Sequence, residues 1–274
     1  MGLTGEKFMK ISKILTAAAI SAVLATGAYT GIAQAQEPLK LTIATEGAYP
    51  PFNFINAAGE LSGFDVDIGR ALCEEMKAEC KFITIEWDGA IPSLQAGKFD
   101  AFIASMSITP ERKKQVDFSN KYYNTPPGLA APKDGKIKGV TKEDLAGKSI
   151  GVQISTTHAN YAEKTFTDST IKSYPTAEEY RLDLANGRLD AASDDSVTLS
   201  QWLNTEDGAC CELVGTWPAV PEIHGPGAGV AFKQGNPELI AKFNDAIKAI
   251  RTNGKYKEIN DKYFDFDAYG AETN

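Results

Sequence analysis

The residues best suited to chemistry lie in the stretch Lys98–Arg112, which reads KFDAFIASMSITPER. Its apolar first part predicts a short buried strand over 99–104. That strand runs into three hydroxyl residues and an arginine, namely Ser105, Ser107, Thr109 and Arg112. Thr109 is expected to cap the helical turn that Pro110 opens. Hydroxyls, free N–H groups and a guanidinium in one crevice can hold a carboxylate. The alternative is an ordinary strand and cap with a solvated arginine.

A second hydroxyl-rich segment, Ser155-Thr156-Thr157-His158, follows another predicted strand at a predicted helix start. The backbone N–H groups of Ser107 and Thr157 could add donors for the same carboxylate. Asp195 ends a further predicted strand and is the natural acceptor for an ammonium group, although turns and caps also favour aspartate. Together these groups could bind an amino acid zwitterion. Three other aspartates are expected to be solvated or capping residues: Asp183, Asp190 and Asp194.

An acidic residue and two aromatic residues follow strand ends in the first half of the chain. They are Glu46, Tyr49 and Trp87. Tyr49 and Trp87 could flatten against an aliphatic stem and attract a cation over their faces. Glu46 could then neutralise a distal ammonium or guanidinium. The alternative is that Tyr49 and Trp87 are ordinary aromatics at the edge of the core.

Catalytic and cofactor sites are poorly supported by the sequence. Ser155, His158 and Asp195 make a weak triad, because the first two are three residues apart and no Gly-x-Ser-x-Gly elbow is present. The glycine-rich run 225–229 lacks the Lys-Ser/Thr pair of a phosphate loop. His158 and His224 are the only histidines, and no Cys/His spacing resembles a zinc site. We therefore expect no catalytic residue, metal or cofactor.

The N-terminus resembles a secretory signal peptide. Lys7, Lys10 and Lys13 precede an Ala-rich apolar run over 14–33, and Ala33-Gln34-Ala35 has the small-x-small pattern of a cleavage site. We expect residues 1–35 to be removed on export. A retained membrane anchor is the alternative, although so much alanine makes a weak spanning helix.

The length and charge restrict the class of partner. The chain has 274 residues, enough for two domains, and a formal net charge of −8. Residues 1–35 carry three lysines and one glutamate, so their removal leaves about −10. Such an acidic protein has no electrostatic footprint for nucleic acid or anionic lipid. The charge suits cationic small molecules, and solubility alone would explain it equally well.

All four cysteines follow residue 35, and an even number fits an oxidising compartment. Cys73 and Cys80 are close enough in sequence to link a helix end to the next strand, and we favour that pair over the other connectivities. Cys210 and Cys211 are adjacent, so both free thiols and an unusual bridge between neighbours stay open.

Alternating strand and helix signals predict an α/β fold with mainly parallel sheets covered by helices. The series begins with an alternating strand over 39–43 and a helix from 64, and a new series starts after irregular sequence near 126. In this second series Thr141-Lys-Glu-Asp144 resembles a helix cap. Near the end of the chain, one face of a further predicted helix is lined by Leu239, Ile240, Phe243, Ile247 and Ile250. Two short crossings, near 126–132 and 225–229, indicate that a second lobe over 127–226 is inserted into a first lobe made of 36–126 and 227–274. A pair of strands would serve as the hinge.

Several motifs resemble, in order, those of the family-3 extracellular solute-binding proteins of ABC importers. The resemblance covers nearly the whole chain after residue 35. The matching motifs are GFDVDIGRALC from Gly63, TEGAYPPF from Thr45, WDGAIPSL from Trp87, ASMSITPER from Ala104, GRLDAA from Gly187 and YFDFDAYG from Tyr263. The similarity is greatest to lysine/arginine/ornithine-binding and histidine-binding proteins, in which Cys73 and Cys80 correspond to a disulfide. Octopine- and nopaline-binding proteins are near relatives.

The resemblance implies a two-lobed fold that closes on a basic amino acid, here arginine, lysine, ornithine or histidine. Arg112 with the amides of Ser107 and Thr157 would take the α-carboxylate, and Asp195 the α-ammonium. Tyr49 and Trp87 would enclose the side chain, and Glu46 would face its distal charge. The implied ligand-binding residues are Glu46, Tyr49, Trp87, Ala104, Ser105, Ser107, Arg112, Thr156, Thr157, His158 and Asp195.

The sequence departs from this family's pattern at three of these positions. Ala104 replaces a serine, His158 stands where glutamine is familiar, and Glu46 is one methylene longer than the usual aspartate. These changes leave the preferred side chain open. Opine binding, or a dehydratase of the cyclohexadienyl kind with Glu46 or His158 as its acid, are the alternatives. The favoured prediction is a periplasmic monomer that delivers its ligand to the membrane permease of an ABC importer.

Overall fold

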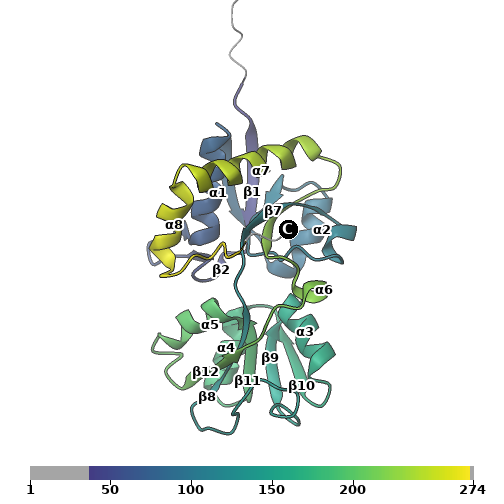
Figure 1. Cartoon of the computed structure of the whole chain (residues 1–274), viewed down its shortest axis with the longest axis vertical. Coiled ribbons are helices and arrows are strands. Elements are labelled where there is room, and N and C mark those ends of the chain that lie inside the picture. The colour runs from purple at the N-terminus through teal and green to yellow at the C-terminus, as the bar shows by residue number, and fades with distance from the viewer. Residues whose placement is uncertain (1–36, 272–274) are drawn as a thin grey trace, which may run out of the picture. The chain divides into compact units, whose positions relative to one another are not determined.

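A computed structural model describes residues 37–271 (Figure 1). Two five-stranded sheets flanked by helices make up most of this part of the chain, together with a small three-stranded sheet. The predicted signal peptide, residues 1–35, lies outside the described residues. The predicted α/β class with two lobes is confirmed, and we call the two sheets with their helices the first lobe and the second lobe.

The first lobe contains the sheet with strand order β5-β1-β6-β13-β7. β1 pairs in parallel with β5 and β6, whereas β13 runs antiparallel to β6 and β7, so only β13 opposes the other strands. The strands are β1 (Lys40–Thr45), β5 (Glu79–Thr84), β6 (Ala101–Phe102), β7 (Asp117–Tyr123) and β13 (Ala228–Phe232). The helices are α1 (Phe64–Glu75), α2 (Ala90–Gln95), α7 (Pro237–Thr252) and α8 (Lys255–Tyr263), with short turns η1 (Trp87–Gly89) and η2 (Arg112–Lys114). The small sheet contains β2 (Ala48–Tyr49), β3 (Asn53–Ile55) and β4 (Leu61–Ser62).

Successive side chains of a strand point to opposite faces of the sheet. In the central strands of this sheet, the side chains on both faces are buried. Ile43 belongs to the core cluster that includes residues of α1 and α7. Its neighbour Ala44 belongs to a second cluster, with Phe102 and the α2 residue Leu94. The apolar runs that predicted buried strands therefore reflect helices on both faces of the sheet.

The second lobe repeats this plan with the order β10-β9-β11-β8-β12. β9 pairs in parallel with β10 and β11, and β8 is the antiparallel strand. The strands are β8 (Pro127–Pro132), β9 (Ser149–Gln153), β10 (Thr170–Tyr174), β11 (Ala191–Asp195) and β12 (Cys211–Thr216). The helices are α3 (Thr157–Thr165), α4 (Ala177–Ala185), α5 (Ser196–Leu203) and α6 (Pro221–His224).

Two segments connect the lobes, as Figure 1 shows. The chain leaves the first sheet after β7 and enters the second at β8, through residues 124–126. It returns through residues 217–227, which contain α6, and enters the first sheet at β13. The lobe boundaries 36–126 with 227–274, and 127–226, stay predictions in their detail.

Two predicted elements differ from the structure. The strand predicted over 99–104 is assigned only at Ala101–Phe102, because the chain turns at Ser105, whose φ is 56°. The predicted helix cap at Thr141 forms its reciprocal hydrogen bonds with Asp144, yet only turns come after it. Gly147, with φ of 72°, lies too close behind the cap for a helix to develop.

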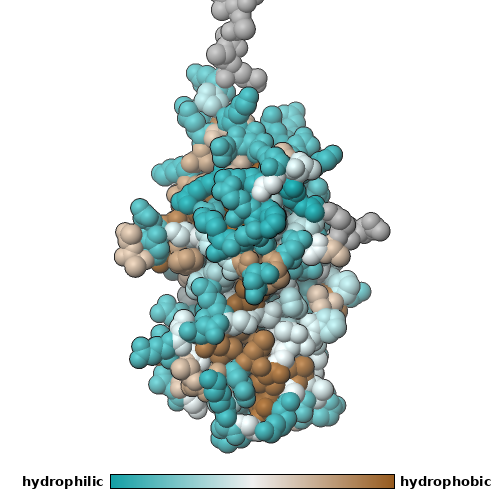
Figure 2. Space-filling view, turned by 60° about the vertical axis from the view of Figure 1, so that its left-hand side comes forward, coloured by the Kyte–Doolittle hydropathy of each residue, from teal (hydrophilic) through white to brown (hydrophobic). Residues whose placement is uncertain are grey.

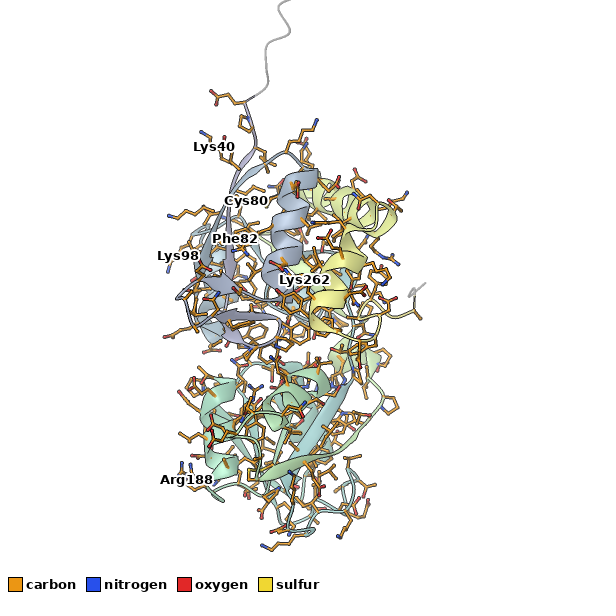
Figure 3. All side chains as sticks on the ribbon, turned by 90° about the vertical axis from the view of Figure 1, so that its left-hand side faces the viewer. Lys40, Cys80, Phe82, Lys98, Arg188 and Lys262 are labelled. Atoms are coloured by element: carbon orange, nitrogen blue, oxygen red, sulfur yellow. A yellow bond between two sulfur atoms is a disulfide. The ribbon has the colours of Figure 1, made fainter. Side chains whose placement is uncertain are left out.

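The predicted disulfide between Cys73 and Cys80 is present and links the end of α1 to β5 (Figure 3). Cys210 and Cys211 are bonded to each other, so of the two possibilities left open the unusual bridge is the one observed. No described cysteine is free.

Replacing Cys73 and Cys80 by serine together is expected to lower the free energy of unfolding by about 2.5 kcal/mol. The bridge closes a short loop, with the two cysteines seven positions apart, and restricts the unfolded chain. Thermal unfolding should show a fall of about 5–10 °C. The matched Cys210→Ser/Cys211→Ser variant opens a smaller loop and should fall less. An unchanged unfolding temperature in the first variant would contradict the prediction.

The two lobes differ in polarity on the face that Figure 2 shows. Figure 2 shows mostly hydrophilic residues over the first lobe, with apolar residues gathered over part of the second lobe. Within residues 37–271, no helix has both the length and the apolar character needed to cross a membrane.

Candidate functional site

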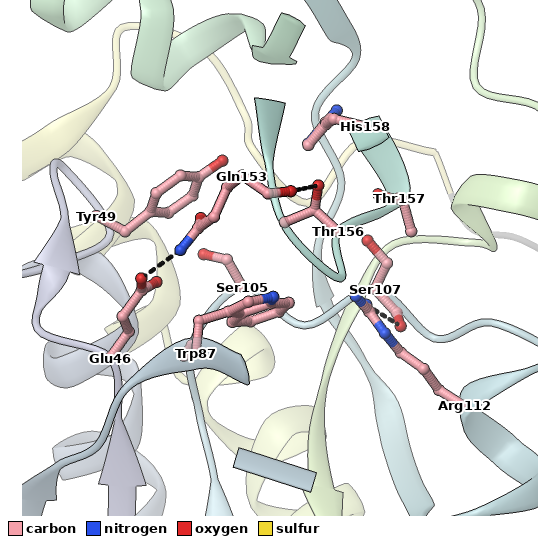
Figure 4. A pocket seen from close by; sticks show the side chains of 11 residues that line it. Glu46, Tyr49, Trp87, Ser105, Ser107, Arg112, Gln153, Thr156, Thr157 and His158 are labelled. Carbon is pink, nitrogen blue, oxygen red and sulfur yellow. Dashed lines mark hydrogen bonds between the residues drawn. The ribbon is translucent and has the colours of Figure 1, made fainter. Parts of the chain in front are cut away.

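A cavity of about 320 Å³ lies between the two lobes (Figure 4). Ten of the eleven predicted ligand-binding residues line it, and Gln153 is the one further lining residue. The eleventh, Asp195, lines an adjoining cavity of about 420 Å³ that shares Tyr49, Ser105, Ser107, Thr157 and His158 with the first. The structure thus brings all the predicted site residues to one region.

The ends of parallel strands position these side chains. Glu46 follows β1 in the first lobe, and Asp195 ends β11 in the second. Ser105 and Ser155 occupy similar places in the two lobes, and both have a left-handed backbone, with φ of 56° and 60°. Non-glycine residues rarely adopt this conformation, and it recurs at ligand sites where surrounding structure holds it. Each lobe therefore turns sharply at a serine, and of the two serines Ser105 lines the cavity.

Arg112 supplies the positive end of the cavity. Its side chain is buried, and its two terminal nitrogens donate to the backbone oxygens of Ser107 (3.1 Å) and Ser155 (3.0 Å). Its guanidinium also lies 5.2 Å from the ring centre of Trp87. Within residues 37–271 no carboxylate lies within ion-pair distance of Arg112, and burial lowers its pKa to about 10. A buried charge of this kind calls for an anionic partner.

Two backbone amides add to this positive end. Thr156 caps α3, where its Oγ1 accepts from the N–H of Ala159 (3.1 Å). The N–H of Thr157, in the first turn of α3, has no acceptor among the described residues, and neither does the N–H of Ser107. Free N–H groups at a helix N-terminus favour an anion. Arg112 and these two amides can together hold a carboxylate.

Glu46 supplies the negative end. Its Oε1 accepts a hydrogen bond of 2.6 Å from Nε2 of Gln153. Burial raises the pKa of Glu46 to about 7, against the lowering effect of that hydrogen bond. In the view of Figure 4, Trp87 lies between Glu46 and Arg112. The cavity can therefore hold a molecule that is anionic at one end and cationic at the other.

Asp195 and Ser105 provide further acceptors. Asp195 is buried, accepts from Oγ1 of Thr125 and from the N–H of Val197 (2.8 Å), and has its pKa raised to about 7 by burial. The hydroxyl of Ser105 donates to Asp65 (2.9 Å). Because that proton is used, Ser105 can only accept from a molecule in the cavity. Both residues suit an ammonium group.

The prediction for Asp194 is wrong, because this residue is neither solvated nor a cap. Its side chain is only 4 % exposed, and it accepts hydrogen bonds from the hydroxyls of Tyr49 (2.6 Å) and Tyr180. Arg181 and His158 each lie 3.6 Å from it. Asp194 thus fixes Tyr49, from the first lobe, against a buried polar network of the second lobe. No local pattern signals this role, since its partners lie far away in sequence.

The geometry gives no catalytic triad. Ser155 donates to Asp88 (2.6 Å), and Nδ1 of His158 has no partner within residues 37–271. Burial lowers the pKa of His158, which favours the neutral form of its ring. Sequence reasoning missed Gln153, Asp194 and His224, the last of which lines the adjoining cavity with its Nε2 unpartnered among the described residues.

Comparison with known proteins agrees with this geometry. Residues 41–266 match the family described as bacterial extracellular solute-binding proteins, family 3. The L-arginine-binding protein of Pseudomonas aeruginosa is 47% identical over 240 residues, covering 86% of this chain and 92% of that protein. The lysine/arginine/ornithine-binding periplasmic protein of Escherichia coli K12 is 36% identical over 236 residues, covering 85% and 90%.

A solved structure shows the same fold. It is that of a Salmonella typhimurium periplasmic binding protein described for its high arginine specificity. The two structures superimpose with a TM-score of 0.75 at 32% sequence identity, covering 82% of this chain and 99% of that one. The family resemblance that the motifs indicate is therefore confirmed. This chain belongs to family 3 of the bacterial extracellular solute-binding proteins.

Proposed function

We propose that this protein binds arginine and related basic amino acids in the periplasm and delivers them to an ABC importer. The observation that carries the proposal is the pairing of charges in one cavity. Arg112 is a buried cation without an ion-pair partner in residues 37–271, and Glu46 is a carboxyl group at the other end. A basic amino acid has the complementary charges at its two ends.

Each end of the ligand has a partner in this proposal. Arg112 and the free amides of Ser107 and Thr157 bind the α-carboxylate through parallel N–H···O bonds. Asp195 accepts from the α-ammonium, and Glu46 faces the distal charge. Tyr49 and Trp87 enclose the aliphatic stem, where their faces attract a cation. Ala104, Thr156 and His158 complete the wall.

Closure of the lobes is the event that the importer would read. Several hydrogen bonds cross between the lobes, including Tyr49 to Asp194, Gln153 to Glu46 and Ser155 to Asp88. A ligand that contacts both lobes adds to these bonds, and thereby shifts the population toward the closed state. The permease then recognises a surface that exists only when the lobes are closed.

The periplasmic assignment rests on two supports. Residues 1–35 have the pattern of a cleaved signal peptide, and relatives such as the lysine/arginine/ornithine-binding protein are named as periplasmic proteins. All described cysteines are in disulfides, as suits an oxidising compartment. The protein would work there as a monomer, since one chain supplies both sides of the cavity.

Isothermal titration with a panel of amino acids tests the proposal. We expect saturable binding of arginine, lysine and ornithine, and none of glutamate or aspartate, whose side chains would face the carboxyl of Glu46. Binding of glutamine or glutamate without binding of any basic amino acid would refute the basic assignment. Turnover of prephenate or arogenate, followed by absorbance, would instead identify an enzyme on this fold.

A further inference from the structure

Gln153 ends β9 in the second lobe and reaches across to the first. Its side chain is buried, and Nε2 donates two hydrogen bonds, to Oε1 of Glu46 (2.6 Å) and to the backbone oxygen of Pro175 (3.0 Å). Both N–H groups of the amide are therefore used. The two acceptors also fix the amide's orientation, because a flipped amide would place its oxygen against two other oxygens.

The orientation of the amide leaves its oxygen as a free acceptor. Oε1 of Gln153 accepts no hydrogen bond from residues 37–271, and it is not one of the fully buried side-chain atoms that lack a partner. Gln153 lines the ligand cavity beside Glu46, as Figure 4 shows. The negative end of the cavity thus presents the carboxylate of Glu46 and, next to it, a neutral amide oxygen.

We propose that Gln153 is the residue that makes this site select a guanidinium over an ammonium group. The inference rests on the proposed function, because it concerns the distal end of a bound basic amino acid. A guanidinium spreads five N–H donors over three nitrogens in one plane. It can donate to Glu46 with one edge and to Oε1 of Gln153 with another nitrogen. An ammonium has its three donors on a single nitrogen, pointing away from one another.

The hydrogen bond between Gln153 and Glu46 strengthens this selection. It holds the carboxylate in one position, with one lone pair of Oε1 already occupied. A planar group that needs two acceptors in a fixed relation gains from such a rigid pair. A flexible ammonium gains less, since it can follow Glu46 wherever that side chain moves. Arginine should therefore bind more tightly than lysine or ornithine.

A purely structural role would have a different signature. The same hydrogen bond joins the two lobes, so its loss could weaken closure on any ligand. In that case arginine, lysine and ornithine would lose affinity by the same factor. Selection by Gln153 instead predicts a change in the ratio of their dissociation constants.

The test is titration of the Gln153→Met variant with arginine, lysine and ornithine. Methionine keeps the length of the side chain and removes both the donors and the acceptor. We expect arginine affinity to fall about tenfold or more, and lysine and ornithine affinity to fall less than about threefold. Ser155→Ala is the matched control, because it removes the cross-lobe bond to Asp88 outside the cavity without changing charge. It should affect all three ligands equally.

Three outcomes would overturn the inference. They are an equal loss for all three ligands in Gln153→Met, no loss at all, or a wild-type protein that binds lysine as tightly as arginine. The last measurement needs no variant and holds even where Gln153→Met folds poorly. A wild-type protein that binds no basic amino acid would overturn the proposed function as well, so the two failures are distinguishable.

Discussion

Replacing Arg112 by methionine is expected to lower arginine affinity about a thousandfold while leaving the ligand-free fold intact. Without the guanidinium, the ligand's carboxylate would enter the cavity with only two amides to meet it, and an unpaired buried charge costs about 4 kcal/mol. Arg112 is itself a buried charge without a carboxylate partner among residues 37–271, and burial lowers its pKa to about 10. Its removal should therefore shift thermal unfolding by no more than about 3 °C.

Titration and thermal unfolding of the same preparations measure both effects. Arg188→Met is the matched control, because Arg188 is an exposed arginine paired with Asp183 outside the cavity. That variant should bind arginine like the wild type. Arg112→Lys should be intermediate, since lysine keeps the charge and loses the two-pronged geometry. If Arg112→Met binds arginine with an affinity within about tenfold of the wild type, Arg112 does not bind the ligand's α-carboxylate.

Much of this site could be predicted from the sequence because its residues follow strand ends. Polar side chains just beyond buried apolar runs are rare enough to be noticed, and the edge of a parallel sheet is where ligands bind. This pattern predicts Glu46, Ser105 and Asp195 as site residues. It does not predict the conformation of Ser105, since only the folded chain shows that its φ is 56°.

Two of the residues that sequence reasoning missed, Gln153 and Asp194, bond to partners in the other lobe. Gln153 bonds to Glu46 across 107 positions of the chain, and Asp194 bonds to Tyr49 across 145. Each lies inside or at the end of a buried strand, where a polar residue usually means a turn or a cap. Their roles depend on closure of the lobes, which no local spacing encodes.

The periodic spacing of apolar residues predicted helices and strands correctly where tertiary packing agreed with the preference of the local sequence. Periodic apolar positions predicted the helices observed as α1 and α7, and the strand expected over 39–43 lies close to β1. The capping signal at Thr141 misled because its hydrogen bonds form in a turn as readily as in a helix. Capping residues show where a chain changes direction, and packing decides whether a helix or a turn forms after them.

Replacing Glu46 by glutamine is expected to lower arginine affinity about a hundredfold at pH 8, by removing the counter-charge for the guanidinium. The variant keeps the size of the side chain. Glu86→Gln removes the same charge from an exposed position next to Trp87 and should have little effect. Titration with arginine and with neutral citrulline separates charge from shape, because citrulline should lose far less affinity. Equal losses for the two ligands would contradict the role of Glu46.

The pH dependence of binding gives an independent measure of the same contact. Burial raises the pKa of both Glu46 and Asp195 to about 7. A bound cation favours the charged carboxylate, so binding must release any proton that these groups hold. Affinity for arginine should therefore fall as the pH drops through 7, since arginine itself does not titrate there.

The steepness with which arginine affinity falls as the pH drops shows how many carboxyl groups release a proton on binding. In the wild type it should approach two protons per arginine, one from each carboxyl group, or about a hundredfold per pH unit. In Glu46→Gln only Asp195 remains, so the slope should fall to one proton, or about tenfold per unit. Citrulline should show a slope of one with the wild type, because only its α-ammonium meets a carboxylate. Titration in two buffers of different ionisation enthalpy counts the released protons directly. If Glu46→Gln releases as many protons as the wild type, Glu46 does not contact the bound cation.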